Sequence, residues 1–170
     1  MLRLHIETAC RRGGALALTL RDLDLDQCLI RLHEKGETIR WQPVSPTLMT
    51  HLRDHAQHRG ATQPTDQILR YRNGTPITRR RYDHLWTRIG THLPWVHTQG
   101  VSTHWLRHTT LTWIERNHGY AIARAYAGHT TTNSNTGTTT TYTRVGMTEI
   151  ATALATLTGE PHPLATNTSH

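Results

Sequence analysis

The chain has 170 residues, a length that suits one domain with its own core and leaves no room for two domains of ordinary size. Hydrophobic residues make up 35% and phenylalanine is absent, so the core must be built from Leu, Ile, Ala, Trp and Tyr. The 19 Lys and Arg residues outnumber the 12 Asp and Glu residues, and the formal charge of +7 favours a polyanionic partner such as nucleic acid.

The N-terminal segment predicts two short helices followed by a small sheet. Apolar residues from Leu2 to Leu18 recur at helical spacing, and Gly13 and Gly14 interrupt them, which predicts a turn between two helices. Alternating apolar and polar residues then predict antiparallel strands, the last two joined by a tight turn that carries Lys35. The expected strands are 23–25, 29–33 and 38–41.

The rest of the chain predicts helices separated by polar loops. Pro46 suits the first turn of a helix, and the apolar residues after it recur every four positions. Gly60 and Gly119 follow such periodic stretches and favour helix ends. The expected helices are 46–59, 78–89, 103–118, 120–127 and 143–157.

Together these elements predict a mainly α fold with a small antiparallel β-sheet near the N-terminus, an α+β domain without internal repeats. We assign residues 1–158 to this domain and expect residues 159–170 to form a disordered tail. The stretch 130–141 is rich in Thr, Asn, Ser and Gly, which predicts a flexible loop.

Cysteine usage and apolar runs indicate the compartment. Cys10 and Cys28 lack the clustered spacing of a disulfide framework or a zinc site, which favours a reducing interior. No apolar run approaches the roughly 18 residues of a membrane span, and the N-terminus lacks the layout of a signal peptide. We therefore expect a cytoplasmic protein without a membrane partner.

The strongest local motif is His104-Trp105-Leu106-Arg107-His108, at the start of a predicted helix. His104 and Arg107 lie one turn apart and can face the same phosphate. An arginine offers two parallel donors to phosphate oxygens, and a histidine can move a proton near neutral pH. A bare His-x-x-Arg is common, so the motif gains its weight from the patterns around it.

A second pattern lies near the N-terminus. It runs Thr8-Ala9-Cys10-Arg11-Arg12-Gly13-Gly14-Ala15-Leu16-Ala17-Leu18, with Asp22-Leu23-Asp24-Leu25 shortly after. This stretch resembles the first box of the tyrosine recombinase (phage integrase) family, which usually reads Thr-Gly-Leu-Arg-x-x-Glu-Leu-x-x-Leu. The resemblance assigns the family's first catalytic arginine to Arg11, which by itself would be an ordinary surface charge at a helix end.

Three further positions follow in the family's order. Lys35 resembles the hairpin lysine, and Ala127-Gly128-His129 resembles a Leu-Gly-His box. The segment 139–145 resembles Thr-Thr-x-x-Tyr-x-His-Val, which makes Tyr142 the nucleophile. Taken singly, Lys35 would be a solvated turn charge and Tyr142 a half-buried aromatic residue. The implied catalytic residues are Arg11, Lys35, His104, Arg107, His129 and Tyr142.

The resemblance implies site-specific DNA recombination or integration, by strand cleavage and rejoining through a 3′-phosphotyrosyl intermediate. The two arginines and two histidines would stabilise charge on the phosphate oxygens. Lys35 would protonate the leaving 5′ oxygen, and His104 would assist proton removal from Tyr142. The sequence shows no carboxylate cluster of the kind that magnesium requires, so we expect neither a metal nor a cofactor.

Double-stranded DNA is the implied partner. Arg40, Arg79, Arg80 and Arg81 are candidates for contacts with its backbone, which give salt-dependent affinity without reading the sequence. The amphipathic segment 146–157 matches the place where recombinases of this type donate a C-terminal helix to a neighbouring subunit. Self-association on DNA as a tetrameric synapse is therefore expected, with packing of this helix on its own domain as an equal alternative.

Some positions depart from the family's pattern. The chain begins shortly before Arg11, so we expect a catalytic domain shortened at its N-terminus and lacking the core-binding domain that family members carry. Gly14 and Ala15 stand at the usual Glu and Leu, the interval from His129 to Tyr142 is longer than usual, and Arg144 replaces a frequent histidine.

Two other functions compete with an active recombinase. The first is a catalytically silent DNA-binding remnant that keeps the basic surface. The second is a histidine-rich metal-binding protein, against which the scattered spacing of the 14 His residues argues.

Overall fold

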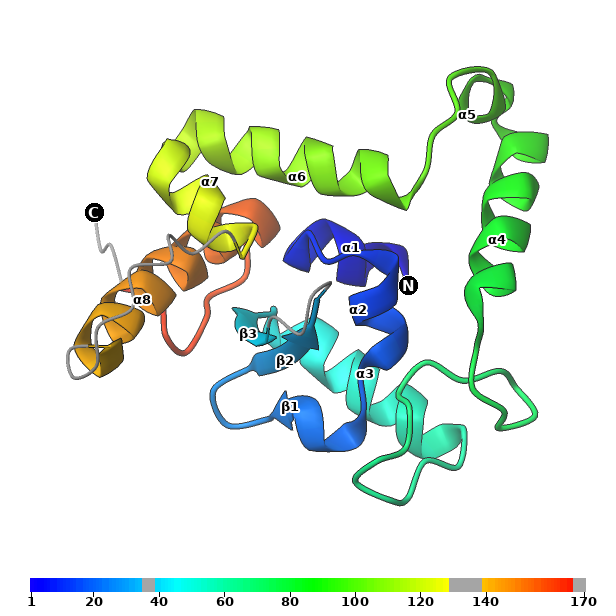
Figure 1. Cartoon of the computed structure of the whole chain (residues 1–170), viewed down its shortest axis with the longest axis horizontal. Coiled ribbons are helices and arrows are strands. Elements are labelled where there is room, and N and C mark those ends of the chain that lie inside the picture. The colour runs from blue at the N-terminus through cyan, green and yellow to red at the C-terminus, as the bar shows by residue number, and fades with distance from the viewer. Residues whose placement is uncertain (35–38, 129–138, 167–170) are drawn as a thin grey trace.

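The computed structural model describes residues 1–34, 39–128 and 139–166, with no side-chain description for residues 139–145. Most of the described chain is helical, and one small sheet lies near the N-terminus (Figure 1). In chain order the elements are α1 (Leu2–Thr8), α2 (Arg12–Ala17), the 3-10 helix η1 (Leu20–Asp22), β1 (Leu23–Asp24), β2 (Leu29–His33), β3 (Ile39–Pro43), α3 (Pro46–His58), α4 (Arg79–His92), α5 (Pro94–Thr98), α6 (Thr103–His118), α7 (Tyr120–Tyr126) and α8 (Thr139–Thr158).

The sheet has three antiparallel strands in the order β1-β2-β3. Ile30 and Leu32 of the central strand are fully buried, because alternate residues of a strand point to the same face. On the other face Arg31 pairs in register with Trp41, and its guanidinium lies 5.9 Å from the centre of a Trp41 ring. The expected fold class, mainly α with a small antiparallel sheet, is confirmed.

Two groups of buried apolar side chains form the core. The first joins α1, α2, the sheet and α3, and it contains Cys10 and Leu52. The second joins α6, α7 and α8, and it contains Ile114 and Leu154. Ala9 belongs to the second group although its neighbour Cys10 belongs to the first. The turn that precedes Arg11 therefore lies where the two groups meet.

The break between α1 and α2 differs from the expected position. We predicted a turn at Gly13–Gly14, but both glycines lie inside α2. The chain turns at Ala9 instead, whose φ of 49° is left-handed, and Arg11 caps the start of α2 with extended backbone. Left-handed alanine is disfavoured by about 1 kcal/mol, so tertiary contacts and not local propensity set this turn.

Helices α4 and α5 lie along one side of the molecule, and α6 crosses back from them over α1 (Figure 1). Polar contacts attach α4 to the body. The Tyr82 hydroxyl lies 2.8 Å from His5 Nε2 on α1. Arg12 pairs with Asp83 at 3.4 Å, and the Trp86 indole donates to Thr103 at 3.2 Å.

The segment after α8 packs on the domain, which differs from the expected disordered tail. Glu160 accepts a hydrogen bond from the backbone N–H of Thr47 and pairs with Arg3 on α1. His162 is buried, and its Nε2 lies 3.2 Å from the carbonyl oxygen of Cys28. Residues 159–166 therefore close over α1, α3 and the sheet, and residues 167–170 lie outside the described part.

The C-terminal helix begins earlier than expected, at Thr139, so the backbone of Tyr142 belongs to the first turns of α8. Ile150 and Leu154 bury the apolar face of α8 in the second core group of its own chain. No helix in the described ranges is both long and apolar enough to cross a membrane.

Candidate active site

Arg11 projects from the turn between the two core groups. Its backbone is extended at the N-cap position of α2, directly after the left-handed Ala9 and the buried Cys10. The side chain is 47% exposed, and its Nη1 donates to Glu34 Oε2 at 3.2 Å. This arginine is thus fixed at one end by the turn and at the other by a carboxylate, while it still faces solvent.

Arg107 lies beneath the same turn. It is a buried residue on α6, and its guanidinium donates to the carbonyl oxygens of Ala9 and Ala127, the latter at 3.0 Å. Burial lowers the pKa of Arg107, and the nearby charge of Arg11 lowers it further. Arg107, the second arginine of the expected site, therefore holds in place the backbone turn from which Arg11 projects.

Arg40 has a parallel role. Its side chain is 9% exposed, and it donates to the carbonyl oxygens of Thr8 at 3.1 Å and Tyr126 at 3.0 Å. Arg40 and Arg107 thus bind consecutive carbonyls on both segments, Thr8–Ala9 and Tyr126–Ala127, and we call these two residues the arginine clamp. The burial of Arg40 argues against the expectation that this residue contacts the DNA backbone, since its guanidinium already donates to carbonyl oxygens inside the protein.

The end of α7 packs directly on this clamp. Gly128 has a φ of +75°, and a Cβ at this position would lie 2.5 Å from Arg40 Cδ. A glycine is therefore required both by the backbone conformation and by the close approach of the arginine. The packing of Arg40 thus explains why a glycine occupies the middle of the expected Ala127-Gly128-His129 box.

His104 lies on the exposed side of α6, one turn before the buried Arg107. Its Nε2 is 2.7 Å from Nε2 of His108, so one ring donates to the other. Ser102 caps the helix without a side-chain hydrogen bond. His104 remains accessible to a ligand that approaches the start of α6.

Three expected catalytic residues have no described side chain. Lys35 and His129 lie outside the described residues. Tyr142 lies on α8, but its side chain is not described. The structure thus brings Arg11 and Arg107 together, and the roles of all six residues stay predictions. Among the described residues no group of three His, Cys, Asp or Glu side chains is arranged to hold a metal ion.

Sequence reasoning missed Glu34 and assigned Arg40 to the surface. Glu34 stands next to Lys35 in a turn of charged residues, where a solvated side chain is the usual outcome. Its side chain is nevertheless only 4% exposed, and it contacts both Arg11 and Arg40. Only the long-range packing of α7 and α2 on the hairpin reveals these roles.

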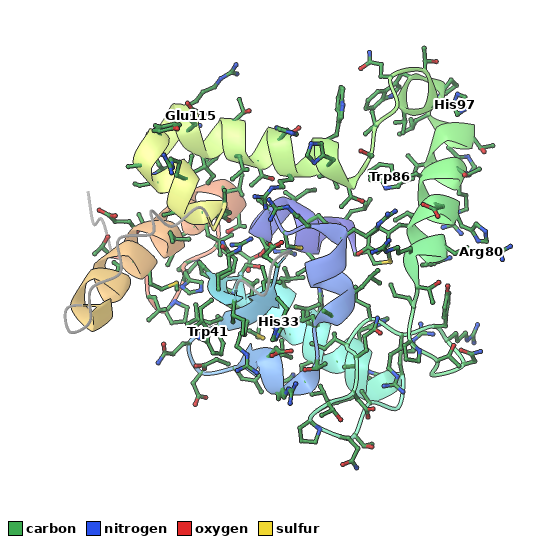
Figure 2. All side chains as sticks on the ribbon, in the orientation of Figure 1. His33, Trp41, Arg80, Trp86, His97 and Glu115 are labelled. Carbon is green, nitrogen blue, oxygen red and sulfur yellow. The ribbon has the colours of Figure 1, made fainter. Side chains whose placement is uncertain are left out.

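The start of α4 carries a basic surface outside this centre. Arg79 and Arg80 are exposed and Arg81 is half-buried. Figure 2 shows Arg80 pointing away from the rest of the molecule. These side chains remain candidates for contacts with a DNA backbone.

Comparison with known families identifies the chain. The profile described as "Phage integrase family" matches residues 1–149. The chain belongs to this family. A comparison of this phage integrase sequence with curated proteins gives no match.

Solved structures with the same fold include recombinases and integrases. The Tn1549 transposon integrase, in complex with a circular intermediate DNA, superposes with a TM-score of 0.61 at 18% identity, covering 76% of this chain and 50% of that one. XerA recombinase gives 0.58 at 19% identity, over 86% and 53% of the two chains. XerH recombinase bound to difH substrate gives 0.60 at 15% identity, over 84% and 44%.

The phage integrase chain thus spans about half the length of these matched structures. At such identities the likeness shows the fold alone. It agrees with the family match, and the expected resemblance to tyrosine recombinases is confirmed.

Proposed function

We propose that this chain is the catalytic domain of a site-specific DNA recombinase that cleaves and rejoins DNA through Tyr142. The observation that carries the proposal is that the family's two arginines, Arg11 and Arg107, are linked through one backbone turn. Arg107 bonds the carbonyl of Ala9, and Ala9 lies in the turn that presents Arg11. The exposed guanidinium that would bind the phosphate, that of Arg11, is therefore presented by a turn that the buried Arg107 holds in place.

The reaction proposed is a transfer of a phosphodiester to tyrosine. The Tyr142 oxygen attacks the phosphorus, the bond to the 5′ oxygen breaks, and a 3′-phosphotyrosyl link forms. His104 receives the tyrosine proton, and Lys35 supplies a proton to the 5′ hydroxyl that leaves. Arg11, His104 and His129 stabilise charge on the non-bridging oxygens, and Arg107 would join them by releasing the carbonyls of Ala9 and Ala127. Reversal of these steps reseals the strand, so the bond energy is kept.

Double-stranded DNA is the proposed substrate. The Tn1549 integrase and XerH were solved in complex with DNA, and their fold is shared by this chain. The chain's formal charge of +7 and the exposed arginines at the start of α4 suit a polyanion. Assembly into a tetrameric synapse is part of the proposal, although α8 would first have to leave the core group that Ile150 and Leu154 occupy here.

Covalent capture tests this function. The protein is incubated with a pool of duplex oligonucleotides that carry a randomised core and a nearby nick, which traps the cleaved strand. We expect a detergent-resistant protein–DNA adduct, and after nuclease digestion a nucleotide mass on the peptide that contains Tyr142. The variant Tyr142→Phe should form none, whereas Tyr120→Phe, at a tyrosine that is 63% exposed on α7, should form as much as wild type.

The outcomes separate the two DNA-based functions. An adduct that depends on Tyr142 supports the enzyme. Salt-sensitive DNA binding without any adduct, even when a family core-binding domain is added, would instead establish the silent DNA-binding remnant.

A further inference from the structure

Glu34 bridges an exposed arginine and a buried one. It follows the last residue of β2, and its carboxylate accepts from Arg11 at 3.2 Å through Oε2 and from Arg40 at 3.3 Å through Oε1. The side chain is 4% exposed. A carboxylate so far removed from water is favourable only with charged partners, and Glu34 has one on each oxygen.

The surroundings of Glu34 are strongly positive. Burial lowers the pKa of both Arg40 and Arg107, and the charge of Glu34 opposes that effect in each case. The charges of Arg11 and Arg40 add to the lowering at Arg107. Without Glu34, the buried guanidinium groups of Arg40 and Arg107 would lose an opposing negative charge at a place where water screens poorly.

Gly14 lies directly against Glu34 and the end of β2. A Cβ built on Gly14 would lie 3.7 Å from Glu34 Cδ, 3.8 Å from Oε2, and 3.3 Å from the carbonyl oxygen of His33. Gly14 also stands where the recombinase box usually carries a glutamate. A glutamate on α2 and Glu34 would compete for the same volume, so this chain has room for one carboxylate there.

We propose that Glu34 is a positioning residue for Arg11, and that it supplies from the β2–β3 hairpin the carboxylate that α2 lacks at Gly14. Through Oε2 it orients the Arg11 guanidinium, and through Oε1 it neutralises the clamp residue Arg40. The predicted effect of Glu34 on catalysis rests on the proposed function. Its predicted effect on stability rests on the described contacts alone.

The test moves the carboxylate from position 34 to position 14 and compares the melting temperatures of the variants. Glu34→Ala is compared with the double variant Glu34→Ala plus Gly14→Glu, and with Gly14→Glu alone. Loss of one member of a buried ion pair is expected to lower the melting temperature by roughly 10 °C. The double variant should recover at least half of this loss. Gly14→Glu in the wild-type background should lower the melting temperature, because two carboxylates then share one buried space.

Two controls isolate the carboxylate. Gly14→Ala in both backgrounds measures the gain in helix propensity and the fit of a bare Cβ. Gly13→Glu places the same residue in α2 where a Cβ has nothing within 4 Å. Neither control should rescue Glu34→Ala. A Gly14→Glu change that stabilises or destabilises both backgrounds equally would overturn the proposed relocation.

DNA readouts separate positioning from mere folding. Removal of Glu34 deletes a negative charge, so affinity for non-specific duplex DNA should stay equal or rise slightly. The rate of Tyr142 adduct formation should nevertheless fall at least 10-fold, and Gly14→Glu should restore part of it. A parallel loss of affinity and rate in still-folded Glu34→Ala would contradict a positioning role. Absence of any wild-type adduct would overturn the proposed function and the catalytic consequence, while the melting-temperature comparison would still decide the structural part.

Discussion

Gly128 lies where the end of α7 passes over the side chain of Arg40. We predict that Gly128→Ala lowers the free energy of unfolding by about 2–3 kcal/mol, because the left-handed backbone costs roughly 1 kcal/mol and the new methyl group displaces Arg40 from its carbonyl partners. Gly60→Ala is the matched control, since φ is +76° there but a Cβ has nothing within 4 Å. Urea denaturation measures the free energy of unfolding of both variants. Equal losses would mean that the Arg40 side chain moves aside without a cost in stability.

His5 couples stability to pH. It is fully buried on α1, its Nδ1 donates to the carbonyl of Cys10, and burial lowers its pKa from 6.5 to about 4. As pH falls below 6.5 the unfolded chain takes up a proton that the folded chain refuses until about pH 4. The contribution of His5 to the free energy of unfolding is therefore complete above pH 6.5 and is lost progressively between pH 6.5 and pH 4.

Urea denaturation at pH 7 and pH 5 tests this prediction. We expect the free energy of unfolding to fall by about 2 kcal/mol through His5 over this interval. Burial lowers the pKa of His55 and His162 in the same direction, so His5→Gln should reduce the slope without abolishing it. An unchanged slope in His5→Gln would assign the pH dependence to other groups.

At single positions the sequence was informative where a motif carried the residue. Arg11 and Arg107 were predicted as partners from their boxes, and the structure joins them through the Ala9 turn. Arg40 could not be predicted as a clamp residue, because its partners are carbonyls on two segments distant in sequence. A charged residue in a strand gives no local sign of such burial.

Among the secondary-structure elements, α3 was the most predictable. Pro46 occupies the first helical position, and the Ser45 side chain caps the helix by accepting from the Leu48 N–H at 3.1 Å. The short α5 was not predicted, since Pro94 to Thr98 is too brief to show periodicity. The α1–α2 break was misplaced because local propensity favoured the glycines over Ala9, whose conformation depends on Arg107.

The segment after α8 supports a prediction at the scale of an element. Glu160 reaches both α1 and the N-terminus of α3, so Glu160→Ala should lower the free energy of unfolding by about 1–2 kcal/mol. Glu149→Ala, on the exposed face of α8, should change it by less than about 0.5 kcal/mol. Equal small effects in chemical denaturation would show that the segment adds no stability and behaves as the tail first expected.

Over the whole molecule, the excess of positive charge predicts a steep salt dependence of DNA binding. Each neutralised phosphate contributes about 0.9 to the slope of log K against log salt concentration, so the triple variant of Arg79, Arg80 and Arg81 to Ala should lower the slope by up to about 3. Fluorescence anisotropy with duplex DNA at several salt concentrations measures it.

Arg40→Gln is the contrasting variant. Since Arg40 is buried, it should lower the melting temperature and leave the salt slope within error of wild type. A reduced slope in Arg40→Gln at full stability would return Arg40 to the DNA-contacting surface.

The global fold was predicted more completely than the site. Apolar periodicity and turn residues were enough for a mainly α domain with a three-stranded sheet. The arrangement of α4 and α5 along one side and the return of the C-terminal segment over α1 were not predicted, because hydrogen bonds between distant residues such as Tyr82 and His5 decide them.

The arginine clamp also bears on how the molecule reaches its native state. Arg107 bonds a carbonyl 98 positions away, and the Tyr126 hydroxyl bonds one 119 positions away. Contacts of such sequence separation require closure of very large chain loops, which makes them slow to form relative to local helices. During synthesis the arginine clamp cannot join the turn at Ala9 to the end of α7 until α7 has left the ribosome. The proposed catalytic centre would therefore be assembled near the end of folding, and a nascent or partly folded chain would be unable to carry out the proposed cleavage of DNA.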